Sequence, residues 1–219
     1  MPTPRGPFSR VLLKLSGEAF SGEGGFGVES GRLRSVAGEI IAARERGSEI
    51  AVVIGGGNII RGAHLAREGV VHRATADQMG MLGTVINGLA LREILVDMGQ
   101  DARCMTAVEI PAVAEPFIRL RAVRHMELGR VVVLAGGIGI PFFTTDTTAA
   151  LRASELDCQA VLKGTKVDGV YDDDPIKNPN ATRFDSLTYT DVLQHDYKVM
   201  DAAAISLCRE NEILAALQK

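Results

Sequence analysis

Four short apolar runs, each followed by a turn with glycine or lysine, constrain the fold of this chain more than any other sequence feature. The runs cover residues 11–15, 49–54, 131–135 and 160–162. The turns are Leu15-Ser16-Gly17-Glu18, Gly55-Gly56-Gly57-Asn58, Gly136-Gly137-Ile138-Gly139 and Lys163-Gly164-Thr165. Strands that are apolar at almost every position are typical of parallel sheets covered by helices on both faces.

Between these strands, apolar residues recur at the spacing of a helix. One apolar stripe consists of Leu33, Val36, Ala37, Ile40 and Ile41, and a second, longer helix is marked by Met79, Leu82, Ile86, Leu89 and Ala90. Strands that alternate with helices predict an α/β sandwich with a mostly parallel sheet between its helical layers. Ligands of such sheets bind beyond the carboxyl ends of the strands, so the four turns should form the functional site.

Composition narrows the class of protein. The chain has 219 residues, of which 46% are hydrophobic, which is enough for one domain, so we expect residues 1–219 to form a single unit. The net charge of −3 argues against binding to nucleic-acid phosphates, which requires a positive field. No apolar run approaches the ~20 residues of a membrane span, and the N-terminus has no signal-peptide pattern. We expect a cytoplasmic protein without a membrane or nucleic-acid partner.

The three cysteines have no spacing that suggests a zinc site or a disulfide framework. Cys104, Cys158 and Cys208 are far apart and odd in number. We expect buried thiols in a reducing compartment.

The glycine turns are candidate phosphate-binding loops, because backbone N–H groups and the start of a following helix attract anions. One such turn alone is more often a tight turn, but their repetition favours function. The chain contains no Walker A sequence, which excludes a P-loop kinase. Residues 22–27 match the dinucleotide-binding pattern, but they lie well past the first strand, so we interpret that match as accidental.

Four charged residues at or near the turns are candidates for binding or neutralising phosphate groups. Lys14 at the end of the first strand could neutralise a phosphoryl group, or could be a solvated charge. Arg61 could grip phosphate oxygens, or be an ordinary exposed arginine. Asp146 could orient lysines or Mg²⁺, or simply cap a helix that runs to Glu155. Lys163 is a possible second cation or a structural lysine.

Together these segments resemble the bacterial uridylate kinases of the amino-acid-kinase superfamily. The resemblance rests on residues 14–18, Gly55-Gly56-Gly57-Asn58 with Arg61, Pro141-Phe142-Phe143-Thr144-Thr145-Asp146, and residues 165–171 with Asp174-Pro175. It spans residues 10–210, and residues 76–81 separate it from acetylglutamate, aspartate and carbamate kinases. It implies a three-layer αβα sandwich of the carbamate-kinase type and transfer of the γ-phosphoryl group of ATP to UMP, which gives UDP and ADP.

The resemblance also implies roles for individual residues. Lys14, Arg61 and Asp146 would be catalytic. ATP would contact Lys14, Leu15, Ser16, Gly17, Gly57, Arg61, Thr165, Tyr171 and Asp174. UMP would contact Gly56, Asp77, Gly137, Ile138, Gly139, Ile140, Pro141, Phe142, Phe143 and Thr144. Mg²⁺ would be held mainly through the ATP phosphates, without assigned protein ligands.

Regulation and assembly are implied in the same way. GTP would activate through the segment Gly22, Glu23, Gly24, Gly25, Phe26 and Gly27, and UTP would inhibit. Both effects would belong to a homohexamer, a trimer of dimers whose dimer contacts involve the long helix after Asp77.

At the C-terminus the sequence departs from the pattern of the family. In the family another buried strand follows the equivalent of Asn211, whereas here Ile213 passes directly into Leu-Ala-Ala-Leu-Gln-Lys. We therefore expect the C-terminal strand region to be absent or incomplete. Two alternatives remain at this level: a kinase of the same fold that acts on a carboxylate or carbamate, and a nucleotide-binding or oxyanion-storage protein without catalysis.

Overall fold

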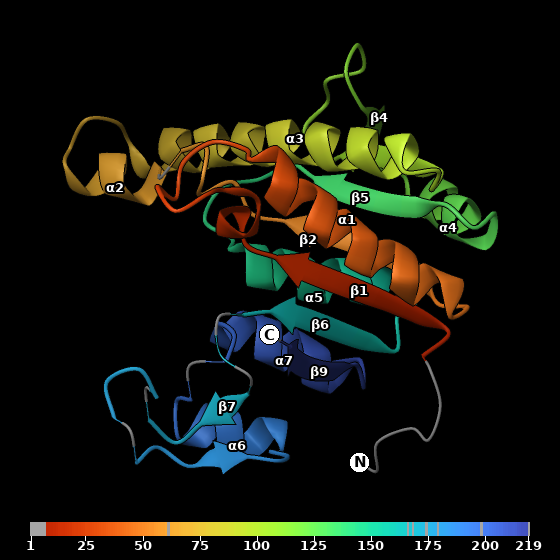
Figure 1. Ribbon diagram of the computed structural model, residues 1–219. Helices are drawn as coiled ribbons and strands as arrows, with labels where there is room; N and C mark the ends of the chain where they lie inside the picture. The colour runs from red at the N-terminus through yellow and green to blue at the C-terminus, as the bar shows by residue number, and fades with distance from the viewer. Residues whose placement is uncertain are drawn as a thin grey trace.

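The structure is a computed structural model that describes residues 8–60, 62–165, 167, 169–173, 175–178, 180–197 and 199–218, without the side chains of residues 63–65 and 218. Arg61 and Asp174, both expected to contact ATP, lie outside the described residues. The described residues form a central sheet with helices on both faces (Figure 1).

The central sheet has seven strands in the order β4-β3-β5-β2-β1-β6-β9, and every neighbouring pair runs parallel. The strands are β1 (Arg10–Leu15), β2 (Glu49–Ile54), β3 (Ala102–Thr106), β4 (Glu115–Pro116), β5 (Val131–Ala135), β6 (Ala160–Gly164) and β9 (Leu214–Gln218). The arrowheads of β1, β5 and β6 point the same way in Figure 1, so the turns after them share one edge of the sheet.

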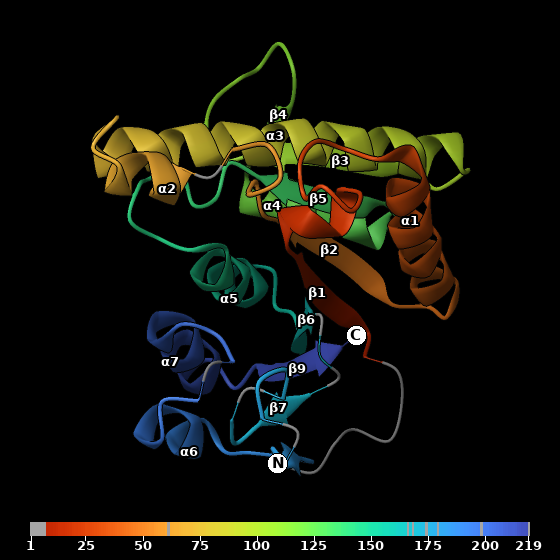
Figure 2. The same cartoon turned by 60° about the vertical axis from the view of Figure 1, so that its left-hand side comes forward.

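Two layers of helices cover this sheet, which confirms the predicted three-layer αβα sandwich (Figure 2). One layer contains α1 (Ser30–Glu45) and α3 (Arg73–Asp97), and the other contains α4 (Arg119–Glu127), α5 (Thr145–Glu155) and α7 (Ala202–Glu210). Val52 packs toward the first layer, whereas its neighbours Ala51 and Val53 pack toward the second. Because the strands are buried on both faces, their sequences read as continuous apolar runs.

The remaining elements are short. They are the 3-10 helix η1 (Gly17–Phe20), α2 (Gly62–Arg67), the antiparallel pair β7 (Val170–Tyr171) and β8 (Arg183–Phe184), and α6 (Tyr189–Gln194). The last three lie between β6 and α7, where the sequence is rich in Asp, Pro and Asn.

The end of the described chain differs from what we expected. Residues Leu214–Gln218 form β9, which pairs with β6 from Ala160 opposite Leu214 to Gly164 opposite Gln218. The expectation that this sheet lacks a strand after Ile213 was therefore wrong. The sequence of this segment has no β-branched residue, so its strand conformation comes from pairing with β6 rather than from local propensity.

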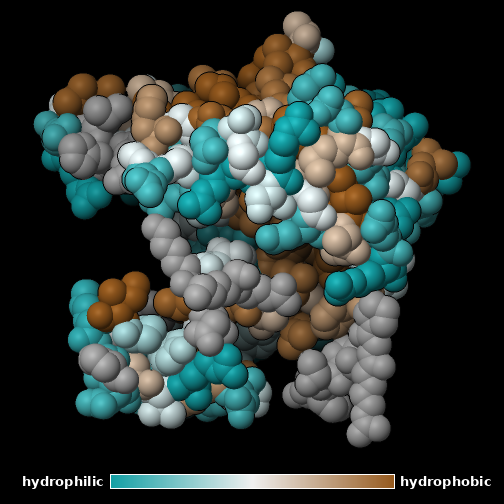
Figure 3. Space-filling view, in the orientation of Figure 1, coloured by the Kyte–Doolittle hydropathy of each residue, from teal (hydrophilic) through white to brown (hydrophobic). Residues whose placement is uncertain are grey.

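Helix α3 carries apolar residues on two faces. Met81, Val85 and Leu91 are buried, whereas Leu82 and Ile86, which we used to recognise the helix, are 48% and 50% exposed. The exposed face contributes to the apolar surface at the top of Figure 3. Among the described helices, α3 has the length and composition that could cross a membrane, but its inner face packs on β2, β3 and β5, as in the core helix of an α/β fold.

Candidate active site

Two lysines from neighbouring strands meet one aspartate at the carboxyl edge of the sheet. Lys14 on β1 lies opposite Lys163 on β6 in the parallel register. Their Nζ atoms lie 2.8 Å from Oδ1 and 2.8 Å from Oδ2 of Asp146, respectively. The three side chains are only 12%, 18% and 15% exposed. Two ammonium groups share one carboxylate, so the cluster keeps a net positive charge in a partly desolvated place, where it acts strongly on an anion.

The contacts of this cluster differ in kind. Lys163 donates hydrogen bonds to Oδ2 of Asp146 and, at 2.6 Å, to the carbonyl of Val199. Oδ1 of Asp146 is buried and accepts no hydrogen bond of regular geometry from the described residues, so its contact with Lys14 is an ion pair only. Lys14 therefore keeps N–H donors that a phosphate oxygen could use.

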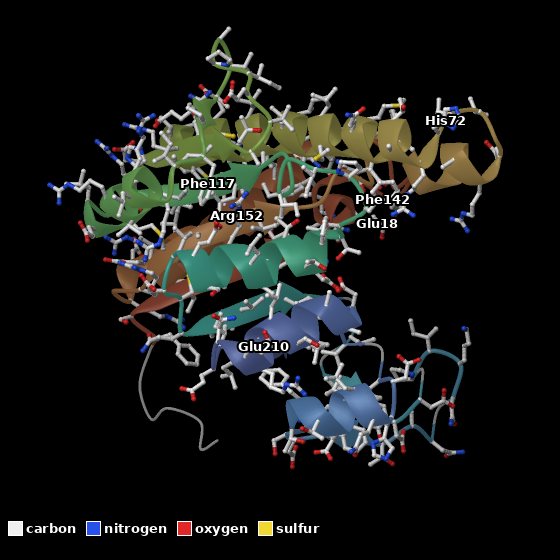
Figure 4. The ribbon with its side chains drawn as sticks, turned by 180° about the vertical axis from the view of Figure 1, so that it is seen from behind. Glu18, His72, Phe117, Phe142, Arg152 and Glu210 are labelled. Atoms are coloured by element: carbon white, nitrogen blue, oxygen red, sulfur yellow. The ribbon has the colours of Figure 1, made fainter. Side chains whose placement is uncertain are left out.

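Asp146 is positioned by the start of α5. Thr144 is the N-cap of this helix, and its hydroxyl accepts hydrogen bonds from the N–H groups of Asp146 and Thr147, both at 3.1 Å. The helix begins at Thr145, one residue before the predicted start at Asp146, and runs to Glu155 as predicted. Farther along α5, the guanidinium of Arg152 lies 3.9 Å from the centre of the Phe117 ring, and Figure 4 shows these two side chains away from the end that carries Phe142.

A second carboxylate, Asp201, fixes the starts of two helices and was missed in the sequence. It caps α7 by accepting from the N–H of Ala204, and it accepts from the hydroxyls of Thr144 and Thr147. Burial raises its pKa, but these hydrogen bonds to the charged form outweigh that effect, so the pKa lies below the ordinary value. The side chain of Asp201 thus holds the loop before Asp146 while remaining ionised.

The glycine turns approach one another closely. A Cβ atom at Gly17 would lie 2.2 Å from Oδ1 of Asn58 and 2.9 Å from the amide nitrogen of Gly57, so only glycine fits there. The amide of Gly55 donates to the carbonyl of Leu15 at 2.9 Å. The turns after β1 and β2 are therefore one packed unit.

The turn after β5 is attached to α3. Gly136, Gly137 and Gly139 all have positive φ angles, between 57° and 89°, which favour glycine. The amide of Gly136 donates to the Thr84 hydroxyl at 2.7 Å. Helix α3 thereby fixes this turn next to the turn that follows β2.

A cavity of about 290 Å³ opens between these turns and the first half of α3. Its lining includes much of the predicted UMP site, namely Gly56, Asp77, Gly137, Ile138, Ile140, Phe143 and Thr144, and also the predicted ATP residue Gly57. Gly139, Pro141 and Phe142 belong to the same loop but do not line the cavity. Arg73, Met81, Thr84 and Thr148 line it without having been singled out as its contacts.

Asp77 connects the two walls of the cavity. Its Oδ1 and Oδ2 lie 2.8 and 2.9 Å from Nε of Arg73, and Oδ2 accepts from the backbone N–H of Phe142 at 2.8 Å. Phe142 has a φ angle of 75°, which is strained for a bulky residue, and this hydrogen bond helps to hold it there. Figure 4 shows Phe142 at the end of the molecule where α3 begins.

The other predicted ATP residues lie at the ends of, or after, β1 and β6, the strands that carry the two lysines. Leu15 and Ser16 lie between Lys14 and Gly17, and Ser16 precedes η1. Thr165 directly follows β6, and Tyr171 ends β7. The predicted regulatory segment, from Gly22 to Gly27, reaches the turn after β2 through its last residue, because the Gly27 amide donates to the Asn58 carbonyl at 2.8 Å.

Comparison with known families shows which family this chain belongs to. The model of the Amino acid kinase family matches residues 9–217. The chain belongs to the amino acid kinase family. Within this family it is 57% identical to the uridylate kinase of Streptomyces avermitilis over 93% of this chain and 81% of that one. It is 54% identical to the uridylate kinase of Zymomonas mobilis over 94% of this chain and 85% of that one.

Solved structures agree with this assignment. The UMP kinase of Bacillus anthracis superposes with a TM-score of 0.94 at 44% identity, over 97% of this chain and 88% of that one. An aspartate kinase from Synechocystis, at 19% identity and a TM-score of 0.72, shares the fold over 95% of this chain and 37% of its own. The resemblance of this amino acid kinase family member to bacterial uridylate kinases is confirmed.

Proposed function

We propose that this chain transfers the γ-phosphoryl group of ATP to UMP and thereby serves pyrimidine nucleotide synthesis in the cytoplasm. The observation that carries the proposal is the Lys14–Asp146–Lys163 cluster beside three glycine turns and a cavity lined by the expected UMP residues. The identity of 57% and 54% to two uridylate kinases supports the choice of UMP over a carboxylate or carbamate acceptor.

Phosphoryl transfer to UMP requires neutralisation of charge and alignment of the two phosphates rather than a general base. An anionic oxygen of the UMP phosphate donates an electron pair to the γ-phosphorus, and the electrons of the bond to the β–γ bridging oxygen leave with ADP. No proton has to move. Lys14 and Lys163 neutralise the negative charge on the transferring group, and Asp146 keeps both ammonium groups at one place. Arg61 is proposed to join them.

Backbone donors supply the rest of the binding. The amides of Gly17 and Gly57 are proposed to meet the ATP phosphates, and the loop from Gly137 to Thr144 to surround the UMP phosphate and ribose. Asp77 faces the cavity with a carboxylate that hydroxyl groups of a ribose could use in place of its present donors. Thr165, Tyr171 and Asp174 are proposed to contact adenosine.

Mg²⁺ is proposed to be held mainly by ATP. Among the residues that the structure describes, no three His, Cys, Asp or Glu side chains gather as a metal site. Asp146 has one buried oxygen without a regular hydrogen bond, but both of its oxygens face ammonium groups, which makes it at most one ligand. Mg²⁺ commonly keeps its waters and takes one or two carboxylates besides phosphate, so these residues fit an ion held through the nucleotide, where it would offset phosphate charge.

Assembly into a hexamer, activation by GTP and inhibition by UTP are further parts of the proposal. The exposed Leu82 and Ile86 on α3 support a dimer contact along that helix, because adjacent exposed apolar side chains mark association surfaces. The hydrogen bond from Gly27 to Asn58 supports a route from the 22–27 segment to the glycine turn.

A coupled assay with ATP, Mg²⁺ and each of UMP, CMP, dTMP and AMP tests the activity. We expect a strong preference for UMP, and loss of turnover in a folded Lys14→Ala variant. Equal rates with CMP would contradict UMP specificity. Binding of ATP without turnover on any acceptor would replace the proposal with the storage or sensor function.

A further inference from the structure

Two asparagine side chains are completely buried where the turn after β2 meets the middle of α3. Asn58 follows Gly57 in the turn, and Asn87 lies on the inner face of the helix; both are 0% exposed. Burying a side-chain amide lowers stability unless its N–H groups are hydrogen-bonded. Two buried amides at this place therefore call for a structural or functional reason. Neither residue touches the 290 Å³ cavity, and the proposed chemistry does not use either of them.

The two amides pair with each other and satisfy every side-chain N–H. Nδ2 of Asn58 donates to Oδ1 of Asn87 at 3.1 Å, and Nδ2 of Asn87 donates to Oδ1 of Asn58 at 2.7 Å. The second N–H of Asn87 goes to the carbonyl of Gly55 at 2.8 Å, and that of Asn58 goes to the carbonyl of Gly27 at 2.7 Å. Both outer acceptors are carbonyls, so an aspartate at either position would lose two donors.

The pair joins three segments that are far apart in the sequence. Asn87 connects α3 to the first residue of the glycine turn, and Asn58 connects the last residue of that turn to Gly27. The backbone of Asn58 adds a second bond, because its carbonyl accepts from the Gly27 amide at 2.8 Å. The Asn58 side chain also limits how closely Gly17 approaches, since a Cβ at Gly17 would collide with its Oδ1.

We propose that Asn58 and Asn87 are positioning residues that set the direction of the Gly56 and Gly57 amides toward phosphate and couple the segment at Gly27 to that turn. This inference rests on the proposed phosphoryl transfer. The turn has three consecutive glycines, whose backbones would otherwise sample many conformations. Fixing the carbonyl of Gly55 and the residue after Gly57 leaves the intervening amides one orientation, and preorganised donors contribute most when they need no rearrangement during the reaction.

The test compares Asn87→Ser and Asn87→Asp with a control on the same helix. Leu91→Ala removes a fully buried side chain one turn away and should destabilise the protein without reaching the turn. We expect kcat of both Asn87 variants to fall by about 10- to 100-fold, somewhat less than the loss of a direct donor, while KM for UMP stays within about threefold. Leu91→Ala should keep kcat within about twofold.

Two further readouts separate positioning from plain packing. Because the two amides act as one unit, the Asn58→Ser/Asn87→Ser double variant should lose no more kcat than the worse single variant. Hydrogen exchange should accelerate in residues 55–60 and 22–29 together in Asn87→Ser, although the Asn87 side chain donates to Gly55 and Asn58 rather than to Gly27. Leu91→Ala should leave both segments unchanged.

Unchanged kcat in a folded Asn87→Ser variant, additive losses in the double variant, or the same kcat loss in Leu91→Ala would overturn the inference. If Asn87→Asp does not fold, Asn87→Ser decides. A wild-type chain that fails to phosphorylate UMP would contradict the proposed function instead, and the exchange experiment would still decide whether the pair couples the two segments.

Discussion

Gly57→Ala should separate phosphate binding from folding. A Cβ at this position meets no atom within 4 Å, and Gly57 does not have a positive φ angle, so the folded structure accommodates alanine. Because alanine restricts the unfolded chain, the free energy of unfolding should rise by about 0.4–1 kcal/mol. Gly57 lines the cavity, where phosphate oxygens are proposed to approach the backbone, so the added methyl group should keep them from its amide.

The expected loss of activity is large by comparison. Displacing one preorganised donor from a transferring group costs about 10²-fold in rate, which corresponds to about 2.7 kcal/mol of transition-state stabilisation. The measurements are urea unfolding for stability and kcat/KM with ATP and UMP for function. Gly38→Ala in α1 is the matched control, since its Cβ would meet only Cε of Met98, at 4.0 Å, and Gly38 does not line the cavity.

A second glycine variant, Gly17→Ala, should lower stability instead of raising it. In Gly17→Ala the Cβ would lie 2.2 Å from Oδ1 of Asn58, so the protein should lose stability, by about 1–3 kcal/mol, together with activity. If Gly57→Ala retained full kcat/KM, or lost activity only in proportion to unfolding, the backbone of this turn would not bind phosphate and the reasoning would be refuted.

Three other outcomes follow from the site and the core. Asp146→Asn removes the charge shared by Lys14 and Lys163 and should lower kcat by about 10²-fold or more while the chain stays folded, as steady-state kinetics and circular dichroism would measure; activity within twofold of wild type would contradict the role of the cluster. Asp201→Ala should lower the free energy of unfolding by about 1–3 kcal/mol at pH 7. Because the pKa of Asp201 is lowered on folding, this difference is complete above the ordinary value of 3.8 and shrinks as pH falls through the folded pKa; denaturant unfolding at pH 7 and pH 3 should show it, and a difference independent of pH would oppose it. Burial raises the pKa of Cys104, Cys158 and Cys208 to about 11, 12 and 11, so a thiol reagent at pH 8 should label them only after denaturation, and rapid labelling of the native protein would contradict their burial.

The α/β fold could be predicted from the sequence because the patterns that indicate it are local. Continuous apolar runs such as residues 131–135 require cover on both faces, and the glycine turns after them mark one edge of a parallel sheet. The same reasoning brought Lys14 near Asp146, because one residue ends a strand and the other begins a helix at that edge. Lys163 was harder to judge, since its role depends on the register that places β6 directly opposite β1.

The missed features depend on tertiary contacts. Asp201 has an ordinary N-cap position before three alanines, and nothing nearby in the sequence reveals that Thr144 and Thr147 donate to it. Residues Leu214–Gln218 lack strand-forming side chains, so only the pairing with β6 defines β9. On α3 the periodicity identified a helix, but it could not show that Leu82 and Ile86 lie on the exposed side, because a helix with two apolar faces gives two acceptable stripes.

The backbone amide signals of the glycine turns offer the most direct measurement of the central claim, that phosphates bind where Lys14, Asp146 and these turns converge. In ¹⁵N-resolved NMR spectra, a non-hydrolysable ATP analogue should shift the amides of Gly17 and Gly57, and UMP should shift those of Gly137 and Gly139. Signals of these glycines that stay unchanged at saturating nucleotide, with shifts elsewhere, would contradict the account.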